Sequence, residues 1–244
     1  MQTIRAFYES HQKSAFADST GLNEILPFLT PGPATAFLDI GCYDGFKTAA
    51  IRDLLGAQET WGVDFVSDWL AQARTYGIQT KEFDLNAGKP LDFPSAAFDV
   101  IICSEVIEHV FSPDELLDEI ARLLKPGGYA VLTTPNLASW KNRIALWLGW
   151  QPFLTEVSTR ARYGNPFMPP GKPSGHIRMF TLRALVEMAK VAGLQPAQIG
   201  GAALRSPART LAGGLSRSGD ALLTRFPALA DRLIIRLEKH EHVF

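Results

Sequence analysis

Residues 37–45 read FLDIGCYDG, and they decide the fold because a short apolar run ends here in an acidic residue and two glycines. A run of this length, followed at once by a helical pattern, indicates a buried strand that turns into a helix. Gly41 and Gly45 allow a tight turn, and the start of the helix offers unpaired N–H groups to a ligand. The glycines lie four positions apart, which differs from the GxGxxG spacing of dinucleotide sites. The stretch therefore predicts a ligand-binding turn of another kind.

The same alternation continues along most of the chain. Short apolar runs predict strands at residues 36–40, 60–64, 80–83, 98–103 and 129–134, with helices at 46–55, 67–76 and 113–124 between them. A helix at 181–193 and two closing strands at 198–204 and 233–239 follow. Alternating strands and helices predict an α/β fold with a Rossmann-like, doubly wound, seven-stranded sheet that is mostly parallel. Ligands of such sheets bind at the carboxyl ends of the strands.

The length of 244 residues predicts a single domain spanning residues 1–244. Residues 1–29 form a polar and aromatic lead-in that is expected to be helical. Residues 137–180 interrupt the alternation with Trp140, Trp147 and Trp150 and with a loop rich in proline and glycine. An insertion of this length after the fifth strand is typical of a lid or a substrate-binding element.

Composition excludes several classes of protein. With 46% hydrophobic and 20% charged residues, the chain is typical of soluble globular proteins. Its two cysteines, Cys42 and Cys103, form no CxxC motif, which argues against a disulfide scaffold and a cysteine zinc site. No apolar stretch is long enough to cross a bilayer, and no signal segment follows Met1. We therefore expect a cytoplasmic protein.

The formal net charge of −1 hides an asymmetry between the two halves of the chain. Acidic side chains dominate up to Asn136, and basic ones dominate after it. A basic half suits a phosphorylated substrate, a nucleic acid or an anionic membrane surface, whereas two opposite halves can also simply neutralise each other. Residues 205–236, rich in leucine and arginine, are the part that peripheral membrane contact would use.

Three acidic residues follow three successive predicted strands. Asp39, Asp64 and Asp84 each stand at the end of an apolar run, so the sheet brings them to one edge. A carboxylate at the end of the second strand can accept hydrogen bonds from both hydroxyls of a ribose, and Phe65 beside it can pack on an adenine. The pattern predicts a nucleoside site, although Asp39 alone would also cap the turn and Phe65 alone would also fill the core.

With these motifs the chain resembles the class I S-adenosylmethionine-dependent methyltransferases, closely over residues 35–136 and more loosely beyond. The segments that carry the resemblance are 39–45, 63–64, 84–85, 98–110 and 124–132. It implies S-adenosylmethionine as cofactor, with Asp39 toward the methionine ammonium and Asp84 toward the adenine amine. The implied cofactor residues are Asp39, Gly41, Tyr43, Gly45, Asp64, Phe65, Asp84, Leu85 and Ser104. Tyr43 stands where the family usually has a second glycine, which predicts a less open backbone path.

The stretch Glu105-Val-Ile-Glu108-His109 follows the fourth strand and is the expected catalytic region. If it is helical, Glu105, Glu108 and His109 share one face, and His176 from the insertion can join them. The arrangement resembles metal-dependent O-methyltransferases of ubiquinone synthesis and of small-RNA 3′ ends, which implies Mg²⁺ held by these four residues. Alternatively His109 or His176, together with Glu105, acts on the acceptor hydroxyl without a metal, or the motif only packs beside the cofactor.

We therefore expect a methyltransferase acting on a small molecule, with a hydroxyl of a sugar, glycolipid or natural product as acceptor. The stretches 134–136 and 176–181 resemble methyltransferases of bacterial surface polysaccharide, glycolipid or natural-product synthesis. Basic residues that include Arg160, Arg162, Arg178 and Arg205 suit a phosphorylated or nucleotide-linked acceptor. The alternatives are an RNA 2′-O-methyltransferase, disfavoured by the absence of an RNA-binding module, and a non-catalytic methyltransferase-like partner protein.

Overall fold

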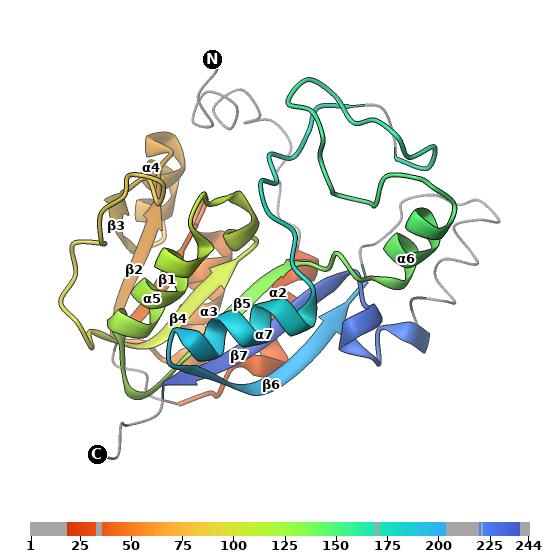
Figure 1. Ribbon diagram of the computed structural model, residues 1–244. Helices are drawn as coiled ribbons and strands as arrows, with labels where there is room; N and C mark the ends of the chain where they lie inside the picture. The colour runs from red at the N-terminus through yellow and green to blue at the C-terminus, as the bar shows by residue number, and fades with distance from the viewer. Residues whose placement is uncertain (1–18, 33–35, 169–170, 204–219, 221, 240–244) are drawn as a thin grey trace.

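The computed structural model describes residues 19–32, 36–168, 171–203, 220 and 222–239. Seven strands of this part form one sheet in the order β3-β2-β1-β4-β5-β7-β6 (Figure 1). Their bounds are β1 Ala36–Ile40, β2 Glu59–Asp64, β3 Gln79–Glu82, β4 Phe98–Ser104, β5 Leu124–Pro135, β6 Leu194–Ala202 and β7 Arg232–Lys239. The predicted seven-stranded sheet is confirmed.

The sheet is parallel except for one strand. All pairs from β3 to β5 are parallel, whereas β7 runs antiparallel to both β5 and β6. The chain builds outward from β1 to β3 and then returns to place β4 on the other side of β1. Because the strand order reverses between β1 and β4, their carboxyl ends define the crevice where a doubly wound sheet binds its ligand.

Helices cover both faces of the sheet (Figure 1). The described helices are α2 Ser19–Ile25, α3 Phe46–Leu55, α4 Ser67–Thr75, α5 Pro113–Leu123, α6 Trp140–Trp147 and α7 Leu182–Val191. Successive strand residues point to opposite faces, so Leu38 packs into a core with α5 and α7 and Phe37 into a second core with α2 and α3. Both faces of the central strands are therefore buried, as a parallel sheet requires.

Several boundaries differ from those the sequence predicts. The strand expected at 129–134 begins at Leu124, directly after α5, and the strand expected at 198–204 begins at Leu194 and ends at Ala202. Residue 204 lies outside the described part of the chain. Two helices are capped at their first turn, because the side chain of Ser112 accepts the Glu115 N–H and that of Thr181 accepts the Ala184 N–H.

The insertion leaves and returns to the sheet at one place. Asn136, just after β5, forms a parallel bridge with Phe180, and the Leu137 N–H donates to the Phe180 carbonyl at 2.8 Å. Between them the chain forms α6 and then a long irregular path (Figure 1). Of the N-terminal lead-in, α2 and a 3-10 turn at Leu26–Phe28 are described, and residues 1–18 lie outside the description. No described helix is long and apolar enough to span a membrane.

Candidate functional site

The turn at the end of β1 has room for no side chain at either of its two glycines. Gly41 and Gly45 adopt φ values of 77° and 80°, a left-handed conformation that favours glycine. A Cβ on Gly41 would lie 2.4 Å from Cγ2 of Val106, and one on Gly45 would lie 2.7 Å from Cα of Ala73. The Gly41 N–H donates to the Val63 carbonyl at 2.8 Å, which ties the turn to β2. Both glycines are thus required by geometry.

Tyr43 corrects one expectation. Its φ is 51°, so it adopts the left-handed conformation that a glycine would take, and the predicted less open path is wrong. A non-glycine residue pays roughly 1–3 kcal/mol for this conformation. Two contacts compensate, because the Tyr43 N–H donates to Oδ2 of Asp64 at 3.0 Å and its ring lies 4.1 Å from the ring of Trp69.

Asp64 lies buried at the end of β2, where three backbone groups orient its carboxylate. Oδ1 accepts the N–H groups of Phe65 at 2.8 Å and Val66 at 3.1 Å, and Oδ2 accepts the Tyr43 N–H. Burial raises the pKa of Asp64, while these three hydrogen bonds act in the opposite direction. The side chain is therefore fixed in position, and Oδ2, which accepts a single N–H group, keeps further capacity to accept a hydrogen bond.

Asp39 is a buried carboxyl of the turn whose pKa is strongly raised. It is buried at the end of β1 and accepts a hydrogen bond from the Thr48 hydroxyl at 2.5 Å. Burial raises its pKa to about 7, and the Thr48 hydrogen bond and the charge of Lys47 offset this only in part. A carboxylate in such a place gains by meeting a cation.

An aromatic group lines the turn where the nucleoside is expected. Phe65 is half-buried, and its ring lies 6.5 Å from that of Trp69, which also contacts Tyr43. Asp84 is exposed after β3 and accepts the Asn86 N–H at 2.9 Å, while Leu85 packs against the core. The structure therefore brings Phe65 to the Asp64 side of the turn and adds Trp69, which the sequence analysis did not identify.

The segment after β4 is not the helix that the sequence spacing requires. Glu105 adopts a left-handed φ of 55°, and a single 3-10 turn, Ile107–His109, follows. Because the turn begins at Ile107 and Glu105 lies before it in a left-handed conformation, Glu105 and Glu108 do not belong to one helix. The helix on which the predicted convergence rests is therefore absent, and Glu105 lies outside the cluster that Glu108 and His109 form.

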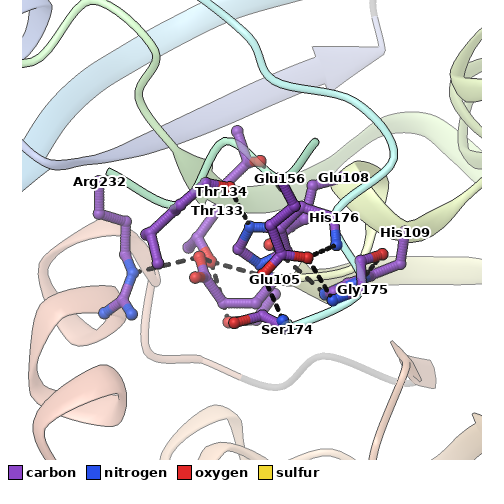
Figure 2. A network of polar contacts seen from close by, with 12 residues as sticks. Glu105, Glu108, His109, Thr133, Thr134, Glu156, Ser174, Gly175, His176 and Arg232 are labelled. Carbon is purple, nitrogen blue, oxygen red and sulfur yellow. Dashed lines mark hydrogen bonds and ion pairs between the residues drawn. The ribbon is translucent and has the colours of Figure 1, made fainter. Parts of the chain in front are cut away.

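Glu105 instead joins an ion-pair network at the start of β7 (Figure 2). Its Oε1 accepts the Thr133 hydroxyl at 2.8 Å and lies 3.1 Å from Nε of Arg232. Arg232 also contacts Glu24 of α2 at 2.6 Å. The hydroxyl of Thr133 lies 3.0 Å from that of Ser104, so the expected cofactor residue Ser104 borders the same network.

Glu108, His109 and His176 do come together (Figure 2). One ligand atom from each lies within 4.8 Å of the others. Glu108 is 0% exposed, its Oε2 accepts the Thr134 hydroxyl at 2.9 Å, and its Oε1 has no hydrogen-bond partner among the described residues. The rings of His109 and His176 are 4.9 Å apart. The structure thus assembles three of the four residues of the predicted cluster.

Backbone carbonyls fix the tautomer of both histidines. Nδ1 of His109 lies 3.0 Å from the Gly175 carbonyl, and Nδ1 of His176 lies 2.9 Å from the Leu154 carbonyl. A carbonyl only accepts, so in each ring Nδ1 carries the proton and Nε2 the lone pair. Burial, and next the neighbouring His176, lowers the pKa of His109 to about 4. The pKa of His109 thus lies below the ordinary histidine value near 6.5.

Burial also raises the pKa of Glu108 well above its ordinary value, with the nearby Glu105 as the second cause. The returning arm of the insertion is stitched to this turn, since the N–H groups of Ile177 and Arg178 both donate to the Glu108 carbonyl, at 2.8 and 3.1 Å. The cluster therefore disfavours charge on Glu108 and His109 and is built from two distant parts of the chain.

Comparison with known proteins gives the class of this fold and site. A family model described as a methyltransferase domain matches residues 8–199. The chain belongs to this family, and it is a class I S-adenosylmethionine-dependent methyltransferase. The expectation drawn from the sequence motifs is confirmed.

Individual relatives agree with this class. A ubiquinone biosynthesis O-methyltransferase of Idiomarina loihiensis is 34% identical over 161 residues, and the match covers 62% of each chain. Among solved structures, an S-adenosylmethionine-dependent methyltransferase of Thermotoga maritima superposes with a TM-score of 0.63 at 17% identity, covering 92% of this chain and 90% of that one. A Burkholderia thailandensis 1,6-didemethyltoxoflavin-N1-methyltransferase gives 0.57 at 16% identity, covering 98% and 85%.

Three functional candidates were not identified from the sequence. Trp69 stands inside a helix, where an aromatic residue is more often part of the core. Arg232 meets Glu105 across a sequence separation of more than a hundred residues, which no local pattern reveals. Glu156, described below, lies in the irregular part of the insertion. A conspicuous signal existed only for Glu156, which is the one acidic residue between Asn136 and Gly175.

Proposed function

We propose that this methyltransferase acts on a hydroxyl oxygen of a small-molecule acceptor and that His176 removes the proton of that hydroxyl. The observation that carries the proposal is the fixed tautomer of His176. Its Nδ1–H is held by the Leu154 carbonyl, which leaves Nε2 as the proton-accepting nitrogen beside Glu108 and His109. His109, with its pKa lowered to about 4, is a weak base.

The cofactor is assigned to the glycine turn. Asp64 is proposed to accept hydrogen bonds from the ribose hydroxyls, since its carboxylate is already oriented by three backbone N–H groups. Asp39 is assigned to the methionine ammonium, whose charge compensates a buried carboxylate. Phe65 and Trp69 are assigned to the adenine face and Asp84 to its exocyclic amine. Gly41 and Gly45 let the backbone approach the cofactor.

The reaction is an in-line displacement at the methyl carbon of the sulfonium. The acceptor oxygen forms a bond to the methyl carbon while the carbon–sulfur bond breaks, and that electron pair neutralises the sulfonium. The hydroxyl proton passes to Nε2 of His176. Because the cofactor supplies the leaving group, the protein contributes mainly alignment and proton removal.

The acceptor class is inferred from the relatives and from the insertion. The relative from Idiomarina loihiensis carries the name of an O-methyltransferase, which supports a hydroxyl acceptor. The match spans 62% of that relative's length, so the substrate of the relative is not assigned to this chain. A hydroxyl of a sugar, glycolipid or natural product stays the proposed class. Of the basic residues considered for a phosphorylated acceptor, Arg162 and Arg178 already hydrogen-bond to Ser174 and Phe111, and Arg205 lies outside the described residues.

Magnesium does not fit the cluster as the structure builds it. Mg²⁺ prefers oxygen ligands, whereas Glu108, His109 and His176 offer one carboxylate oxygen and two imidazole nitrogens. Glu105, the second carboxylate of the predicted site, is paired with Arg232. The donor set suits an imidazole-preferring ion such as Zn²⁺, which would act as a Lewis acid on the acceptor. The proposed proton transfer does not use a metal.

The test is transfer of a labelled methyl group from S-adenosylmethionine to a panel containing a catechol, a glycoside and an RNA, in excess chelator. We expect transfer to a small-molecule hydroxyl and a 10²–10⁴-fold lower kcat in His176→Asn, as the loss of a general base predicts. Tyr163→Phe, a 60% exposed residue of the same insertion, is the matched control. Transfer to RNA alone, no transfer to any acceptor, or activity lost in chelator would contradict the proposal.

A further inference from the structure

We propose that Glu156 is a positioning residue that holds His176 in its proton-accepting tautomer. The inference deepens the proposed function, on which it rests, because His176 is the proposed base. Glu156 does not itself belong to the cluster of Glu108, His109 and His176. It acts through the backbone of the segment that carries His176 (Figure 2).

The carboxylate of Glu156 accepts three consecutive backbone N–H groups. Oε1 accepts the Ser174 N–H, and Oε2 accepts those of Gly175 at 2.7 Å and His176 at 3.1 Å. Successive backbone N–H groups that converge on one point form an anion-binding nest. In this protein, the nest is filled by a side chain from the opposite arm of the insertion. Charge-assisted hydrogen bonds of this kind are about twice as strong as neutral ones.

The residue two positions before Glu156 holds the other end of His176. Leu154 adopts a left-handed φ of 63°, and its carbonyl accepts the Nδ1–H of His176 at 2.9 Å. A bulky residue in this conformation persists only where its surroundings enforce it. Residues 154–156 thus contact His176 at two points. The Leu154 carbonyl accepts the ring N–H, and the Glu156 carboxylate accepts the main-chain N–H.

Glu156 is also linked to the second imidazole, that of His109, through Gly175. Gly175, whose N–H donates to Glu156, places its carbonyl 3.0 Å from Nδ1 of His109. Within the described residues, the structure shows no ion pair between Glu156 and a lysine or arginine. The carboxylate is therefore committed to the backbone at 174–176, and its loss releases both the position and the tautomer of His176.

The experiment reads the tautomer directly, by long-range nitrogen–proton NMR of the imidazole rings in the full chain without acceptor. In the wild type we expect His176 as the Nδ1–H tautomer. In Glu156→Ala we expect its signals to move to an average of the two tautomers. In Glu187→Ala, an exposed carboxylate on α7, we expect no change. Glu156→Gln keeps one acceptor oxygen and should lie between, which gives a second reading if the alanine variant does not fold.

Kinetics separate positioning from a general loss of structure. Glu156→Ala should lower kcat about 10²-fold, the scale of a misplaced catalytic group, with the KM for S-adenosylmethionine unchanged. An unchanged His176 tautomer in Glu156→Ala overturns the positioning role, whatever the activity. An altered tautomer combined with full activity of both Glu156→Ala and His176→Asn upholds the positioning role and contradicts the proposed base.

Discussion

The two halves of the crevice are built in different ways. The cofactor half is made by residues that follow β1 and β2 directly, and its turn is fixed by Gly41, Gly45 and a network of backbone N–H groups around Asp64. The acceptor half combines Glu108 and His109 after β4 with His176 from the insertion. Gly175, the neighbour of His176, contacts His109 across a separation of 66 residues. The cofactor half is formed by residues close together in the sequence, whereas the acceptor half depends on contacts between residues far apart in the sequence.

The halves also differ in how they treat charge. In the cofactor half burial raises the pKa of Asp39 and Asp64, so each carboxylate gains from a ligand that donates hydrogen bonds or carries positive charge. In the acceptor half burial raises the pKa of Glu108 and lowers that of His109, so both groups are kept neutral. This contrast supports the proposed assignment of a charged cofactor to the first half and of an uncharged hydroxyl to the second.

The largest expected effect lies in the cofactor half. Gly45→Ala should lower the free energy of unfolding by roughly 2–5 kcal/mol, because left-handed strain and overpacking add. The new Cβ would lie 2.7 Å from Cα of Ala73, which belongs to a helix and has no room to move. Gly88→Ala is the matched control, with φ of 65° and no atom within 4 Å of its Cβ. It should cost about 1 kcal/mol. Urea unfolding of both variants measures the difference, and equal losses would contradict it.

Asp39→Asn should stabilise the unliganded protein at high pH by as much as about 4 kcal/mol, since each unit of pKa shift is worth about 1.36 kcal/mol. The pKa of Asp39 in the folded protein, about 7, lies above the ordinary value of 3.8, so the folded state favours the protonated carboxyl. The wild type therefore loses stability as the pH rises from 3.8 to 7. Asparagine has no such loss and can still accept the Thr48 hydrogen bond. Thermal unfolding from pH 4 to 9 should show a gap that grows with pH, and a constant gap would refute it.

How far the sequence predicts each half follows from the same contrast. Each strand and the glycine turn is formed by contiguous residues. Periodicity and spacing therefore locate Asp39, Asp64 and Asp84 correctly at or just after the ends of β1, β2 and β3. The turn after β4 was predicted as a helix from the spacing of Glu105, Glu108 and His109. Glu105 instead adopts a left-handed φ and pairs with Arg232 of β7, a contact far along the chain that the local pattern does not contain.

Trp69→Ala should weaken S-adenosylmethionine binding by about 1–3 kcal/mol, the usual contribution of an aromatic ring stacked on a base. Trp69 contacts Tyr43 in the turn. Trp147→Ala is the control in the acceptor half, because that side chain is 84% exposed on α6 and should leave cofactor affinity unchanged. Fluorescence titration of the two variants compares the affinities. Equal affinities for the two would remove Trp69 from the cofactor site.

The smallest effect concerns the proposed lid. We expect residues 150–168 to exchange amide hydrogens faster than the strands in the free protein, since few backbone hydrogen bonds hold this path. They should slow when an acceptor and the spent cofactor are both present. Residues 174–178, tied to Glu156 and Glu108, should change little. Hydrogen exchange followed by mass spectrometry makes the comparison, and identical rates in both states would exclude a lid.

The division into a cofactor half and an acceptor half is tested most directly by calorimetric titration of S-adenosylmethionine into three proteins. Asp64→Ala should lose about 1.5–3 kcal/mol of binding free energy relative to the wild type, as for hydrogen bonds to a charged group. His176→Asn should bind as the wild type does. Unchanged affinity in Asp64→Ala, or an equal loss in His176→Asn, would contradict the division.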